Sequence, residues 1–231
     1  MTEDEVIRHI QALVAAGEYV DELLGLPGLQ LSGGGAFKGN RRIYSRGTPE
    51  HLQARAAGLL EKLPPLTAPA SAAAVAETER HLGFPLPRLL RRLYLEVGNG
   101  GFGPGYGLIG LGEAERAGNG GDDLHDGPWK GAGSASTALL AVCSWGCDIY
   151  SLVDCASADA RMWAWDPNPV APADLGKALF KEELSLCQWL GRWVNGRCYQ
   201  PCLLQDPDTG EWRGASEGEK AELAACLSAG P

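Results

Sequence analysis

The stretch from Leu82 to Leu111 constrains the fold of this chain more than any other. It reads LGFPLPRLLRRLYLEVGNGGFGPGYGLIGL. Gly83 is suited to end one helix and Pro87 to open the next, because glycine accepts the left-handed cap conformation and proline suits the first helical turn. Apolar residues then repeat at helical spacing as far as Gly98, where a glycine-rich loop begins. The predicted order is helix, helix, loop and a short strand over 108–111.

The glycine-rich loop that starts at Gly98 reads GNGGFGPG, which resembles a phosphate-cradling loop in composition. A dinucleotide-binding fingerprint follows a strand and opens a helix, so that the helix N-terminus supports the phosphate. This loop instead follows a helix and leads into a strand, and it lacks the lysine of a P-loop. We therefore reject nucleotide binding here and interpret the stretch as a signature of the fold.

Residues 1–66 are predicted to form a mainly helical N-terminal extension. Helical spacing of apolar residues favours a helix over 3–24, and 41–44 suits a short strand. A Thr-Pro-Glu run starts a second helix over 48–63, because threonine caps the first amides and proline suits the first turn. The residues expected on its buried face are Leu52, Ala56, Leu59, Leu60 and Leu63. Two prolines end it, and 66–70 is interpreted as a linker.

Residues 67–231 are predicted to form an α+β domain, with a core over 67–195 and a C-terminal hairpin and helix over 196–231. The expected elements are a helix over 71–83, the proline-started helix, strands over 139–145, 149–153 and 161–165, a helix over 178–194, a hairpin over 202–212 and a helix over 217–227. Residues 113–136 are expected to be a long polar surface loop. Helices followed by antiparallel hairpins indicate a central antiparallel or mixed sheet flanked by helices.

The formal net charge of −9 bears on the class of partner. A nucleic-acid binder needs a basic face to neutralise phosphates, so an acidic chain argues against that function. Acidity suits a basic protein partner through electrostatic steering, although it can also serve solubility alone. No long apolar run is present for a membrane span, and the acidic N-terminus is unlike a signal peptide. The expected location is therefore the cytoplasm, with the seven cysteines as free thiols.

The search for catalytic or metal-binding residues finds little. Nucleophilic catalysis needs a positioned base, and no histidine lies beside a nucleophile-like turn. His125 has three aspartates around it and could hold a divalent cation, but an acidic solvated loop explains the cluster better. The pairs Cys143/Cys147 and Cys198/Cys202 fall within loose zinc spacing, yet core cysteines are the favoured interpretation. We predict no enzyme activity, metal or cofactor.

Several motifs together resemble the SUKH superfamily, which includes the fungal Knr/Smi cell-wall-assembly regulators and bacterial toxin-immunity proteins. The motifs are Leu82–Pro87, then Leu90, Leu93 and Tyr94, Gly98–Phe102, Trp145–Tyr150, Met162–Asp166 and the segment from Phe180 to Trp193. Their order is that of the family, over about 67–195. The resemblance implies an α+β domain that binds proteins and has no catalytic residues to carry over. The extension over 1–66 departs from the family pattern.

The resemblance leads to a functional hypothesis and a candidate surface. The leading hypothesis is an immunity-type protein that binds and neutralises a cognate toxin, possibly a basic nuclease. The alternative is a regulatory scaffold that recruits other cytoplasmic proteins. Loop and hairpin aromatics make good interface anchors. The candidate partner-binding residues are Asn99, Phe102, Tyr106, Trp145, Asp148, Trp163 and Asp166.

Overall fold

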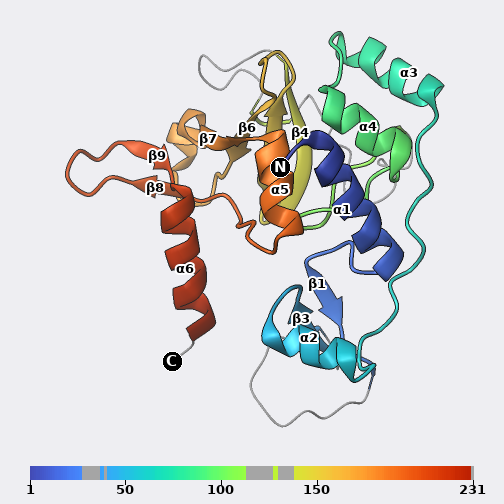
Figure 1. Cartoon of the computed structure of the whole chain (residues 1–231). Coiled ribbons are helices and arrows are strands. Elements are labelled where there is room, and N and C mark those ends of the chain that lie inside the picture. Colours follow the sequence, from blue (N-terminus) through green and yellow to red (C-terminus); the bar gives the residue numbers. More distant parts are fainter. Residues whose placement is uncertain (28–36, 39–40, 113–126, 130–137, 230–231) are drawn as a thin grey trace.

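The computed structural model describes residues 1–27, 37–38, 41–112, 127–129 and 138–229 of the chain. Figure 1 shows helices on one face of a sheet, a small unit containing β1, β3 and α2 beneath it, and α6 projecting at the C-terminal end. The helices are α1 (Glu3–Ala16), α2 (Pro49–Ala56), α3 (Ala72–Leu82), α4 (Arg88–Glu96), the 3-10 turn Pro172–Lys177, α5 (Leu186–Val194) and α6 (Glu217–Ala229). The strands are β1 (Glu22–Leu24), β2 (Phe37–Lys38), β3 (Arg41–Ser45), β4 (Leu139–Gly146), β5 (Ile149–Asp154), β6 (Arg161–Trp165), β7 (Leu179–Ser185), β8 (Leu203–Gln205) and β9 (Trp212–Gly214).

The central sheet has the order β4-β5-β6-β7, and every neighbouring pair is antiparallel. Both of its faces are apolar. One face carries Leu140, Val153 and Met162 and packs with α1, α4 and α5 into the main core. The other carries Leu152 and Trp165 and packs with the segments that cover it into a second cluster. Strands buried on both faces explain why β4 and β5 are almost continuously apolar. The predicted α+β class is confirmed.

The first 66 residues divide between two packing environments. α1 contributes Val6, Ile7 and Ile10 to the main core, so it is integral to the helical layer over the sheet. The strands β1, β3 and β2 form a separate three-stranded sheet. With α2, that sheet buries a small cluster of its own around Leu23 and Tyr44. We call residues 21–63 the N-terminal unit, of which the structure describes 21–27, 37–38 and 41–63.

Both N-terminal helices are shorter than predicted. The helix expected over 3–24 ends at Ala16, because Gly17 takes a left-handed cap conformation with φ 68°. The helix expected over 48–63 starts at the predicted Thr48 cap but ends at Ala56. Residues 59–61 instead hydrogen-bond to the end of β1, through Leu26 N–H to Leu59 O and Glu61 N–H to Leu24 O. The predicted burial of Leu52 and Ala56 is wrong, since Leu52 is 53% exposed and Ala56 is exposed as well.

The largest correction concerns the helix predicted over 178–194. Its first half is the strand β7, which pairs with β6, and only its second half is the helix α5. Phe180 and Leu184 are both buried, and a spacing of four residues satisfies either a helix or a strand of period two. The helix starts at Ser185, where a capping box joins the Ser185 and Gln188 side chains to each other's backbone amides.

Most of the other predicted helices and strands are found at the expected residues. The helices over 71–83 and 217–227, the three central strands and the hairpin over 202–212 are confirmed. The strand predicted over 108–111 is reduced to a single antiparallel bridge between Leu108 and Cys143. Most of the predicted loop over 113–136 lies outside the described residues.

Candidate partner-binding surface

The glycine-rich loop is shaped by close backbone contacts. A Cβ at Gly100 would lie 2.5 Å from the Gly110 nitrogen, and one at Gly98 would lie 2.7 Å from the Leu66 side chain. Asn99 closes the loop internally, because its side-chain amide donates to Leu111 O at 2.9 Å and its oxygen accepts from Leu111 N–H at 2.7 Å. Glycine is therefore required here for space, which accounts for the composition without a phosphate.

The exposed end of this loop lies against the turn of the β4–β5 hairpin. Tyr106 is 68% exposed, and a Cβ at Gly146 would lie 2.8 Å from its hydroxyl. The turn residues Cys147 and Asp148 have φ of 49° and 58°, and both are exposed. Two consecutive left-handed residues form the turn that a two-residue hairpin needs, but non-glycine residues adopt it at a cost. Trp145 beside them is half-buried and donates to Ser151 Oγ at 2.9 Å.

Asp166 stabilises this turn indirectly, through hydrogen bonds with Asn168. Its carboxylate is 5% exposed and accepts from the Asn168 side chain at 3.0 Å and from Leu203 N–H at 3.3 Å. Asn168 in turn donates to Cys147 O at 2.9 Å. The Asp166 side chain therefore holds the start of β8 and, through Asn168, the hairpin turn.

The seven predicted residues thus fall into three groups. Tyr106, Trp145 and Asp148 come together as an accessible cluster, which we call the hairpin-tip surface. Phe102 is fully buried, and Asn99 and Asp166 have their side chains engaged internally, so these three shape the surface without being offered to a partner. Trp163 is half-buried in the middle of β6 on the second face of the sheet, apart from that cluster.

The sequence did not predict a role for Asp21 of the N-terminal unit, which holds the glycine-rich loop in place. One carboxylate oxygen accepts from Trp193 Nε1 at 2.7 Å, and the other accepts from Gly105 N–H at 3.0 Å. Tyr19 O also accepts from Gly103 N–H at 3.0 Å. Arg46 completes the junction, 3.7 Å from Asp21 and stacked on Trp193 at 4.7 Å from the ring centroid. Burial raises the pKa of Asp21, against the effect of these donors. No local pattern signals such contacts, because Asp21 and Gly105 are far apart in the chain.

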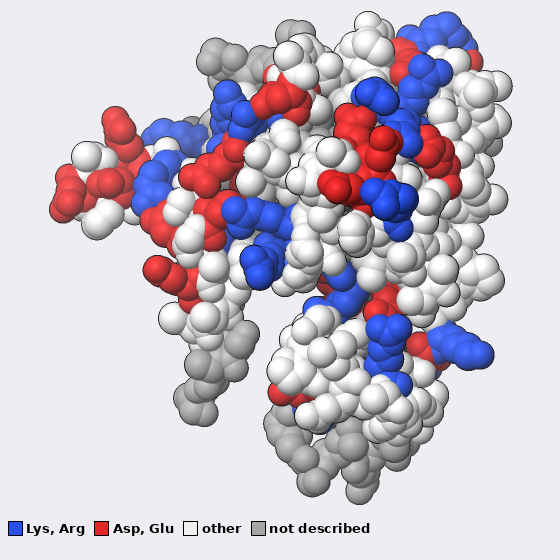
Figure 2. Space-filling model, in the orientation of Figure 1, with Lys and Arg blue, Asp and Glu red and all other residues white. Residues whose placement is uncertain are grey.

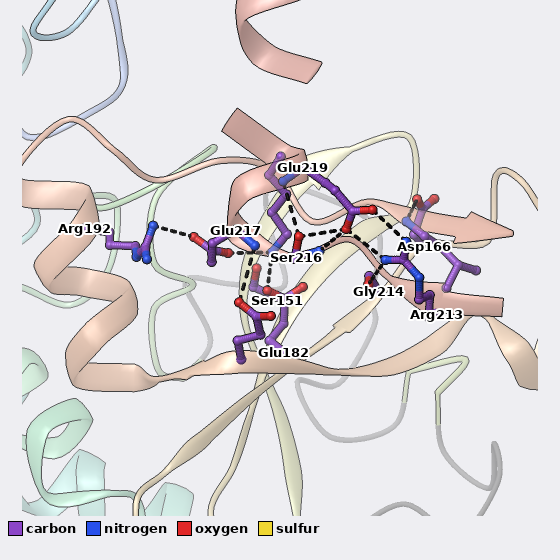
Figure 3. Close-up of polar contacts among 12 residues, drawn as sticks. Ser151, Asp166, Glu182, Arg192, Arg213, Gly214, Ser216, Glu217 and Glu219 are labelled. Carbon is purple, nitrogen blue, oxygen red and sulfur yellow. Dashed lines mark hydrogen bonds and ion pairs between the residues drawn. The ribbon is translucent and has the colours of Figure 1, made fainter. Parts of the chain in front are cut away.

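A second missed feature is the charged cluster that fastens α6 to the sheet (Figure 3). Lys220 is 4% exposed and forms ion pairs with Glu182 of β7 and, at 2.9 Å, with Glu217. Glu217 also pairs with Arg192 of α5 at 3.0 Å. Burial alone would lower the pKa of Lys220, but the two carboxylates raise it overall, and burial raises the pKa of Glu182. The helix is therefore held by its first turn through ionic contacts.

Within the described residues, no group of histidine, cysteine and carboxylate side chains gathers as a metal site. His125 and its neighbouring aspartates lie outside those residues. Cys143 is fully buried and its thiol donates to Pro104 O at 3.1 Å, and burial raises its pKa well above the ordinary value. Such a thiol is a core residue rather than a reactive one. Among the helices that the structure describes, none has the length and apolar content required to cross a membrane.

Comparison with known families assigns residues 69–190 to the SMI1 / KNR4 family (SUKH-1), a match that covers more than half of the chain. The chain belongs to this family. No curated protein and no solved structure matches it. The matched segment begins before α3 and ends within α5, so it contains the loop and the hairpin turn of the hairpin-tip surface. This SUKH domain thus falls in a family of immunity and regulatory proteins, which are generally non-catalytic.

Proposed function

We propose that this SUKH domain is an immunity-type protein that binds a cognate toxin and neutralises it by direct contact. Membership of the family is the observation that carries the proposal. The surface we assign to the contact is the hairpin-tip surface of Tyr106, Trp145 and Asp148. It combines the exposed ring of Tyr106 with the carboxylate of Asp148, which lies in a turn of costly backbone conformation. Backbone strain of this kind is concentrated at functional sites.

The net charge of −9 supports a basic partner, such as a nuclease-like toxin. Opposite charge accelerates encounter between proteins and is screened by salt, whereas short-range contacts set the dissociation rate. We therefore expect the association rate to fall about ten-fold or more between low and high salt, with a much smaller change in dissociation rate. Surface plasmon resonance at two salt concentrations measures both rates.

The test is capture of the toxin encoded beside this gene by the purified full-length protein. We expect Tyr106→Ala to raise the dissociation constant about ten-fold, because the variant loses an aromatic anchor. Leu52→Ala, which removes another exposed large apolar side chain, this one from α2, is the control and is expected to bind like wild type. Equal binding by both variants would show that the hairpin-tip surface is not the interface.

The regulatory-scaffold alternative follows from the same family, which includes regulators. An activity assay separates the two functions. An immunity protein abolishes the toxin's activity at a one-to-one ratio, whereas a scaffold binds its partner and leaves the partner's activity intact. Failure to capture any neighbouring toxin would contradict the immunity function itself.

A further inference from the structure

Residues of the β8–β9 hairpin and of the segment 177–180 line an open pocket of about 400 Å³ that lies outside the hairpin-tip surface. Its lining residues are Lys177, Leu179, Phe180, Gly210, Glu211 and Trp212. Figure 1 shows the β8–β9 hairpin projecting beside β7. The pocket is formed between residues 210–212, at the turn end of this hairpin, and residues 177–180. The hairpin follows residue 190, where the match to the family ends, so the pocket depends on a part of the chain outside that match.

Part of the pocket lining is apolar and packed against the second cluster. Phe180 is 7% exposed, and a Cβ at Gly214 would lie 2.5 Å from its ring, so β9 can approach β7 because residue 214 is glycine. Trp212 is half-buried and packs against the second cluster, as does Leu179. A flat indole fixed at the edge of a pocket provides a face on which a planar group can stack.

The charge of the pocket favours a cation. Glu211 is exposed and forms no ion pair with any described residue, whereas Lys177 pairs with Asp174 at 2.8 Å. Asp206 and Asp208 lie on the same hairpin, and Figure 2 shows carboxylates gathered over this arm. A pocket lined by both an unpaired carboxylate and an indole suits a guanidinium group, which stacks on aromatic rings and pairs with carboxylates.

We propose that this pocket receives an arginine side chain of the protein partner, with Trp212 as the stacking face and Glu211 as the counter-charge. The inference rests on the proposed function for the class of partner, a basic protein. It adds a second contact point and explains how an acidic domain would select a partner by more than net charge.

A peptide titration tests the pocket without the toxin. The probe is acetyl-Gly-Arg-Gly-amide at millimolar concentration, and its control is the citrulline peptide, which has nearly the same shape but no charge. We expect the indole N–H resonance of Trp212 in the full-length protein to move with the arginine peptide and not with the citrulline peptide. In Glu211→Gln the movement is expected to fall about three-fold. In Asp208→Asn, an equal change of charge outside the pocket, it is expected to persist.

Equal responses to the two peptides, or equal losses in Glu211→Gln and Asp208→Asn, would overturn the proposal. Movement with acetyl-Gly-Glu-Gly-amide instead would show that Lys177 selects an anion, which also overturns it. With a captured toxin, Glu211→Gln is expected to weaken binding about five-fold and Asp208→Asn less than about two-fold. Failure to capture a toxin contradicts the proposed function alone, because the peptide titration decides the pocket's ligand independently.

Discussion

At the scale of single residues, Asp21 links the helix α5 to the glycine-rich loop that carries part of the proposed interface. Its two oxygens accept hydrogen bonds from Trp193 of α5 and from Gly105 of the loop that carries Tyr106. A carboxylate is suited to this position because both of its oxygens are acceptors. The residue lies outside the matched family segment, so the N-terminal unit contributes directly to the shape of the candidate surface.

Asp21→Asn tests this connection. The amide has one acceptor oxygen, so its NH2 group must face either the Trp193 N–H or the Gly105 N–H. We expect a loss of about 2 kcal/mol in the free energy of unfolding in urea, together with faster hydrogen exchange of the Gly105 amide. Glu22→Gln removes the neighbouring, exposed carboxylate and is expected to change stability by less than about 0.5 kcal/mol. Unchanged exchange at Gly105 would show that the loop is held without Asp21.

Residue types alone could not separate contact residues from supporting ones. Asn99, Tyr106 and Asp148 all lie in loops or turns, where polar and aromatic residues are typical of binding sites. Only Tyr106 and Asp148 of these three are offered to solvent, since Asn99 bonds to Leu111 across its own loop. Whether a loop side chain points inward depends on how the loop folds back on itself. That folding is determined by contacts between residues that are far apart in the sequence.

At the scale of elements, local signals predicted where most helices start better than where they end. The cap at Thr48 was predicted from residue type, because a cap needs only the amides of the next turn. The strand β7 was predicted as a helix, because its pairing with β6 is a tertiary contact and its apolar spacing fits both periods. Burial alternates along β7, with Lys181 and Glu183 exposed, but the polar Glu182 at an inward position hides that alternation in the sequence.

The attachment of α6 is the element-level feature most open to test. In Lys220→Met, the carboxylate of Glu182 stays buried without its cation. We expect a loss of about 3 kcal/mol in the free energy of unfolding and reduced exchange protection in α6. Lys181→Met, an exposed lysine on β7, is the control and is expected to be near wild type. The double variant Lys220→Met/Glu182→Leu is expected to recover most of the lost free energy of unfolding, because it leaves no unpaired buried charge. If the double variant is no more stable than Lys220→Met, packing and not charge holds the helix in place.

At the scale of the whole molecule, the family match and the folded core do not coincide. The match covers residues 69–190, yet the main core includes Val6, Ile7 and Ile10 of α1, which are at most 3% exposed. The sequence signals for the start of α1 and for the family segment were each correct, but neither showed that the two share one core, because a periodic pattern does not specify which two apolar faces meet.

The fragment 67–231 is therefore expected not to fold by itself, although it contains the whole family match. Removing α1 uncovers the apolar surface of α5 and the sheet that Val6, Ile7 and Ile10 cover, and each such side chain contributes about 1.5–3 kcal/mol when buried. Circular dichroism in urea should show a cooperative transition for the full chain and none for the fragment. In the full chain, Ile10→Ala is expected to cost about 3 kcal/mol and the exposed Gln11→Ala almost nothing. A cooperative unfolding transition of the fragment would instead place a domain boundary near residue 66. It would show that the SUKH core folds without α1.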